Sequence, residues 1–144
     1  MPLSQNLLFE ATSPKDTEFE HPPGAALIRR LSATLASAGW ETAEIDNWRD
    51  CGWSVICRRQ TSELEVVLSQ VPEGRWMLQV APMRVPGLIS RWFGGSQSAT
   101  TEQVYELACS VHRALSDAQF LGNPRWQWDG FPDDNHSTPE PNAA

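Results

Sequence analysis

Tyr105, Cys109, His112 and Ser116 are the side chains whose types and spacing could support chemistry. On a helix they form one strip, and Cys109 and His112, three residues apart, can touch. Such a contact could activate a thiolate or supply two metal ligands. Catalysis also requires an orienting group and an oxyanion donor, and a metal requires further ligands, none of which is spaced nearby. We therefore expect a helix rim here, with Tyr105, Cys109 and His112 only as secondary pocket candidates.

Other chemical motifs are equally sparse. Asp129, Asp133, Asp134 and His136 form a loose acidic cluster without the alternating ligands and terminal glutamate of a calcium loop. Three cysteines without paired spacing are typical of reduced thiols in a cytoplasmic protein. The N-terminus lacks the pattern of a signal peptide, and no apolar run is long enough to span a membrane. We expect no catalytic residue, metal or cofactor, and the sequence favours a non-enzymatic protein.

The elements that would position these residues centre on Trp53 to Pro82. Three short runs alternate apolar and polar residues, with turn formers between them, which predicts an antiparallel meander. One face of this meander collects nine residues as the expected core layer: Trp53, Val55, Cys57, Leu64, Val66, Leu68, Trp76, Leu78 and Val80.

Helical patterns flank the meander. The first follows Pro22, Pro23 and Gly24, and Gly39 is expected to end it, with Trp40 making the accompanying apolar contact. Its apolar face is predicted to contain Leu27, Ile28, Leu31, Leu35 and Ala38. The second helix is capped by Thr100 or Thr101, and its predicted buried stripe is Val104, Leu107, Ala108, Val111 and Leu115. A weak edge strand is expected over 41–48 and a short strand over 125–128.

Charge is distributed unevenly along the chain, whose net charge is −7. Residues 24–128 contain ten arginines and ten acidic residues, so the acidity lies in the two flanks. We expect a flexible arm over 1–22, in which Leu7, Leu8 and Phe9 can pack against the body, one domain over 23–128 and a disordered acidic tail over 129–144. No arginine-rich stripe is present, which argues against binding to nucleic acid.

Two apolar features could contact a partner. Residues 86–95 begin with proline, end with two glycines and are expected to form a short helix that acts as a lid, a knob or a core cap. Its apolar residues are Leu88, Ile89, Trp92 and Phe93. The second feature is a modest stripe of Ile56, Val67 and Met77 on the face of the meander that is turned away from the core.

The order of these elements predicts an α+β fold, in which a meander of three to four strands carries both long helices on one face as a two-layer sandwich. In architecture alone, this outline resembles bacterial immunity proteins and secretion chaperones. The leading hypothesis is a cytosolic module that binds another protein. The alternative is a small-ligand binder or small enzyme with a pocket between sheet and helices. Self-association through the sheet edge or outer face is a third hypothesis.

Overall fold

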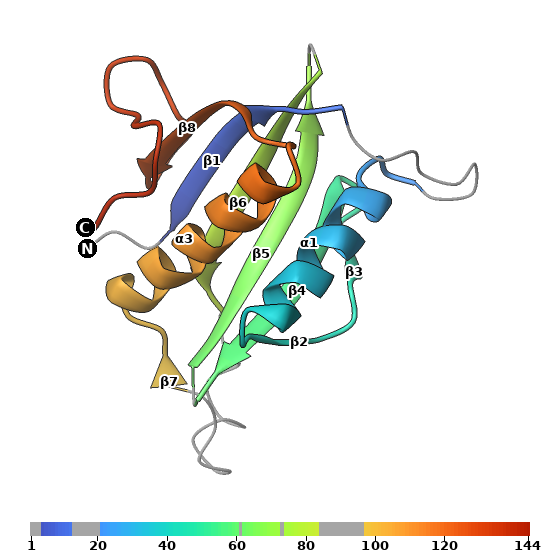
Figure 1. Ribbon diagram of the computed structural model, residues 1–144, viewed down its shortest axis with the longest axis vertical. Coiled ribbons are helices and arrows are strands. Elements are labelled where there is room, and N and C mark those ends of the chain that lie inside the picture. Colours follow the sequence, from blue (N-terminus) through green and yellow to red (C-terminus); the bar gives the residue numbers. More distant parts are fainter. Residues whose placement is uncertain (1–3, 13–20, 61, 73, 84–96) are drawn as a thin grey trace.

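The computed structural model describes residues 4–12, 21–60, 62–72, 74–83 and 97–144. Within this part of the chain, two helices lie on one face of a single eight-stranded sheet (Figure 1). The helices are α1 (Ala25–Ser37) and α3 (Thr101–Asp117). The strands are β1 (Gln5–Glu10), β2 (Glu41–Thr42), β3 (Asp46–Trp48), β4 (Gly52–Arg59), β5 (Ser62–Val71), β6 (Arg75–Pro82), β7 (Gln97–Ser98) and β8 (Gly122–Trp128). The predicted α+β class is confirmed, but the sheet has more strands than the three or four expected.

The predicted meander forms the centre of the sheet. Strands β4, β5 and β6 pair antiparallel in sequence order, and Val55 is opposite Val66, which is opposite Val80. These three residues face the helices and are buried, as are the other predicted core-layer residues except Trp53, which is partly buried. Alternation therefore predicted the inner face of the meander correctly, because successive side chains of a strand point to opposite faces.

Strand β1 corrects the prediction of a flexible arm over 1–22. It lies between β6 and β8 in the strand order β2-β4-β5-β6-β1-β8, antiparallel to both neighbours. Leu7 and Phe9 point into the core and are 0% and 1% exposed. The arm prediction was wrong for Gln5–Glu10 because the buried strand is short and begins with two polar residues, Gln5 and Asn6.

Local hydrogen bonds explain where α1 ends and where α3 begins. In α1 the Trp40 N–H donates to the Leu35 carbonyl (3.1 Å) and the Gly39 N–H to the Ala36 carbonyl (3.2 Å), with Gly39 at φ +98°. These bonds and this conformation define a Schellman stop. In α3, Thr100 and Gln103 form a reciprocal capping box. The expected apolar faces are buried, except that Ala38 is exposed at the end of α1.

The C-terminal segment corrects the prediction of a disordered tail over 129–144. Thr138 makes an antiparallel bridge with Trp126, in which the Trp126 N–H donates to the Thr138 carbonyl at 2.7 Å. Further along, the Asn142 carbonyl accepts from Gln5 Nε2 (3.0 Å) and Trp128 Nε1 (2.9 Å). The polar composition of this segment concealed its role as a cover for the free edge of β8. Neither helix in the described residues has the length and apolar character needed to cross a membrane.

Candidate functional site

The chemical strip on α3 has a structural partner that the sequence did not reveal. His112 Nδ1 accepts a hydrogen bond from Trp126 Nε1 at 3.1 Å, and Trp126 on β8 is fully buried. Burial lowers the pKa of His112 from its ordinary value, although the Glu140 carboxylate acts in the opposite direction. The ring nitrogen that a catalytic base would use is thus already occupied, and the imidazole is held neutral to accept this bond.

Of the other three members of the strip, Tyr105 and Cys109 are half-buried and Ser116 is exposed. A hydrogen bond with Cys109 raises the pKa of the Tyr105 phenol, so this phenol stays protonated in neutral solution. The remaining buried thiol, Cys57 in β4, has its pKa raised by burial to about 12. The Cys57 thiol is therefore a poor nucleophile, because the thiolate is the reactive form. Among the described residues, no group of three His, Cys, Asp or Glu side chains could hold a metal ion.

The outer face of the sheet contains the predicted stripe in modified form. Ile56, Val67 and Met77 all lie on this face, one each on β4, β5 and β6. Val67 is opposite Ser54 and Gln79, and Met77 is opposite Ser69, so the three residues follow a diagonal across the strands. Ile56 and Met77 are half-buried, whereas Val67 is only 5% exposed. Leu88, Ile89, Trp92 and Phe93 lie outside the described residues.

Beside this diagonal, the outer face is hollowed into a trough of about 710 Å³. We call it the outer-face trough. Its lining consists of Ser4, Trp48, Arg49, Glu65, Gln79, Ala81, Pro82, Met83 and Asp129. One wall is a stacked pair in which the Arg49 guanidinium lies 5.0 Å from the centre of the Trp48 ring. The lining thus combines apolar surface with three charged side chains, as in protein-binding surfaces.

The opposite wall and the floor are also ordered by specific contacts. Asp129 Oδ1 accepts from the Ser4 N–H at 3.0 Å, and the Asp129 N–H donates to the Ser4 carbonyl at 2.8 Å. Glu65 lies on the floor, opposite Ala81. Burial raises the pKa of Glu65, and the nearby positive charge of Arg49 offsets part of this effect. A partly desolvated carboxylate on an open sheet face is a natural point of recognition for a donor group.

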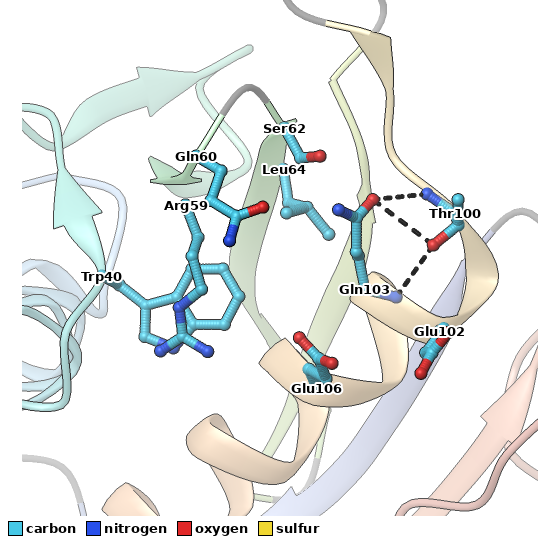
Figure 2. Close-up of a pocket in the computed structure, with 9 residues that line it drawn as sticks. All are labelled: Trp40, Arg59, Gln60, Ser62, Leu64, Thr100, Glu102, Gln103 and Glu106. Atoms are coloured by element: carbon cyan, nitrogen blue, oxygen red, sulfur yellow. Dashed lines mark hydrogen bonds between the residues drawn. The ribbon is translucent and has the colours of Figure 1, made fainter.

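A second hollow, of about 260 Å³, lies between sheet and helices and is shown in Figure 2. We call it the Trp40 pocket. It is formed by Trp40, by the turn from β4 into β5 and by the first turns of α3, and its lining is Trp40, Arg59, Gln60, Ser62, Leu64, Thr100, Glu102, Gln103 and Glu106. The Arg59 guanidinium lies 3.9 Å from the centre of the Trp40 ring and donates to the Ala38 carbonyl at 3.2 Å.

The expected pocket residues Tyr105, Cys109 and His112 do not line the Trp40 pocket. Sequence reasoning placed Trp40 at the end of α1 but did not connect it to Arg59 or to the start of α3. The available signal in the sequence was the polar break at Gln60 and Thr61, between the two alternating runs that form β4 and β5. The turn at this break brings Arg59 and Ser62 to the end of the sheet where α3 begins.

Comparison of the sequence with models of known protein families and with curated proteins gives no match. The fold defines the class of the protein as a two-layer α+β protein, in which both helices of the described residues lie on one face of the sheet.

Proposed function

We propose that this protein is a non-enzymatic, cytosolic protein-binding module whose partner contacts the outer face of the sheet. A role like that of an immunity protein or a chaperone is consistent with this proposal. The observation that carries it is the outer-face trough, which lies on the face of the sheet opposite α1 and α3 and combines aromatic, aliphatic and charged side chains. Such a mixture gives both buried apolar area and orienting polar contacts.

Several features support recognition of a protein segment in the trough. Trp48 and Arg49, residue types enriched in binding hot spots, form one wall. Glu65 and Asp129 provide carboxylates on the floor and the opposite wall, where a partner's N–H groups or basic side chains could bind. The apolar diagonal of Ile56 and Met77 extends the same surface. Residues 86–95, with Leu88, Ile89, Trp92 and Phe93, remain a predicted second contact.

A matched pair of substitutions tests this proposal. Ala81→Arg places a long charged side chain inside the trough, whereas Ala33→Arg makes the same change on the exposed surface of α1. Both variants should keep the circular dichroism spectrum of the wild type. Affinity purification from native lysate with quantitative mass spectrometry should recover the same partner with wild type and Ala33→Arg. With Ala81→Arg, recovery should fall roughly tenfold, which corresponds to about 1.4 kcal/mol of binding free energy.

Sedimentation of the purified chain tests whether the partner is a second copy of this chain or a different protein. A dimer that Ala81→Arg dissociates would make the partner a second copy of this chain. Undiminished recovery by Ala81→Arg, or loss with both variants alike, would contradict binding through the trough.

The second candidate function is binding of a small ligand in the Trp40 pocket. The specific observation in its favour is the position of this pocket, which lies between sheet and helices as the alternative hypothesis expects. Its volume of about 260 Å³ lies just below the roughly 300–1,000 Å³ of typical small-molecule sites. A ligand here would be small, and this is why the outer face is the stronger candidate.

A further inference from the structure

We propose that the Trp40 pocket binds an organic cation, namely an ammonium or guanidinium group on a short apolar stem. This inference rests on the second candidate function, because it names the chemical class of the ligand for that pocket. Such a group can belong to a free amine or to a lysine or arginine side chain. The outer-face trough is a separate surface and shares no lining residue with the pocket.

Two carboxylates of α3 favour a positive ligand. Glu102 and Glu106 are one helical turn apart, both are exposed, and both line the pocket. Within the described residues, neither has an ion-pair partner within 4.0 Å. Like charges at this spacing destabilise a helix, and a cation bound beside them relieves that repulsion. Figure 2 shows Glu106 rising from α3 between Arg59 and Gln103.

A buried hydroxyl supplies an independent indication of a ligand. Ser62 is only 5% exposed and lines the pocket, and its hydroxyl makes no hydrogen bond to the other lining residues drawn in Figure 2. Figure 2 shows this hydroxyl directed toward the side of the pocket where α3 begins. A hydroxyl that faces a hollow without a partner in its lining is available to donate a hydrogen bond to a ligand or to accept one from it. An ammonium group, which has three donors, would satisfy it.

The remaining walls suit the apolar stem of such a ligand. Leu64 is fully buried at the pocket floor, and Trp40 forms one side. The Trp40 ring is fixed in place because its Nε1 donates to Ser110 Oγ at 3.1 Å. Alkyl stems of basic groups commonly lie on apolar surface of this kind while the charged head stays near polar groups.

Arg59 is the one positive side chain in the lining, and its contacts hold it to the α1 side. Its guanidinium lies on the Trp40 ring and donates to the Ala38 carbonyl. An anionic ligand would be attracted by the positive charge of Arg59 but repelled by the negative charges of both Glu102 and Glu106. The helix N-terminus offers it little more, because the capping box already satisfies the Thr100 and Gln103 N–H groups. The balance of charge therefore favours a cation.

The test is an NMR titration of the ¹⁵N-labelled full chain with three probes. Pentylammonium chloride represents a free amine, the peptide acetyl-Gly-Lys-Gly-amide represents a side chain, and sodium pentanoate carries the same stem with a negative charge. We expect saturable shifts of the Ser62, Leu64 and Glu106 amide signals with one or both cations. Binding of the peptide alone assigns the site to a protein side chain, and binding of the amine alone to a free amine.

Charge variants make the result specific. Glu106→Gln should weaken cation binding roughly two- to fivefold, as expected for one exposed charge, and Glu102→Gln/Glu106→Gln should weaken it further. Glu44→Gln changes the net charge equally at an exposed site outside the pocket and should leave the affinity unchanged. Preserved amide spectra establish that each variant is folded. Equal binding of pentanoate, no saturable shift with either cation, or equal weakening by Glu44→Gln would overturn the proposal. None of these outcomes would bear on the separate proposal that a partner protein binds in the outer-face trough.

Discussion

At the scale of single residues, the contact between His112 and Trp126 shows how a neighbour from another element assigns a role. The imidazole accepts from a fully buried indole, and this requires a neutral Nδ1. The sequence placed His112 correctly on α3 beside Cys109. It did not show the tryptophan fourteen residues further on, because that contact is created only when β8 packs against the helix.

The His112 pKa predicts a pH dependence of stability. Because the folded-state pKa lies below the ordinary value of 6.5, the unfolded chain binds the proton first on acidification. The contribution of neutral His112 to the free energy of unfolding should therefore be fully present above pH 6.5. It should decrease as the pH falls toward the folded-state pKa. Urea denaturation at pH 7.5 and 5.5 measures this loss.

Two substitutions isolate the histidine in that experiment. His112→Asn places an amide oxygen near the position of Nδ1, so it should keep the Trp126 bond and show a smaller loss of stability at pH 5.5. His112→Ala leaves the indole N–H unpaired and should lower the free energy of unfolding by about 1–3 kcal/mol at pH 7.5. Identical pH profiles for wild type and His112→Asn would disprove the assignment.

At the scale of elements, the two helices end by the same motif with different residues. The stop of α1 has Gly39 at φ +98°, and the corresponding residue of α3 is Gln119 at φ +62°. In α3 the Phe120 N–H donates to the Leu115 carbonyl at 2.9 Å and the Gln119 N–H to the Ser116 carbonyl at 3.0 Å. Glycine made the first stop recognisable in the sequence, whereas glutamine concealed the second.

This pair of helix ends predicts opposite effects of two small substitutions. Gly39→Ala should lower the free energy of unfolding by about 1 kcal/mol, because a side chain in the left-handed conformation is strained. The added Cβ would have room, since its nearest neighbour is Arg59 Nη2 at 3.6 Å. Gln119→Gly should raise the free energy of unfolding by about 0.5 kcal/mol. The backbone strain that it removes from the folded state outweighs the conformational entropy that glycine adds to the unfolded chain. Thermal unfolding by calorimetry measures both, and equal signs would refute this explanation.

At the scale of the whole molecule, the two ends of the chain complete the sheet together. Strand β1 joins β6 to β8, and the segment after Trp128 covers the free edge of β8. The buried Gln5 side chain depends on this arrangement, because its Nε2 donates to the Asn142 carbonyl. Its Oε1 has no hydrogen-bond partner in the described residues.

Truncation of the C-terminus tests this closure. Removal of residues 139–144 takes away the carbonyl that accepts from both Gln5 and Trp128, and should lower the free energy of unfolding by about 1–3 kcal/mol. Removal of residues 143–144 alone deletes two exposed alanines and should change stability by less than about 0.5 kcal/mol. Urea denaturation compares the two variants, and equal stabilities would show that the segment does not hold the sheet.

The sequence by itself determined the central meander, the two helices with their buried stripes, and the α+β class. Those features rest on local rules, namely alternation in strands, periodicity in helices, and glycine or threonine at helix ends.

Only the tertiary structure decided which segments join the sheet and where the hollows lie. Strand β1 is stable because β6 and β8 lie on either side, and the Trp40 pocket exists because a turn after β4 meets the start of α3. The physical reason is that burial and hydrogen bonding between distant segments depend on their neighbours in space. The periodicity of a short segment contains no record of those neighbours.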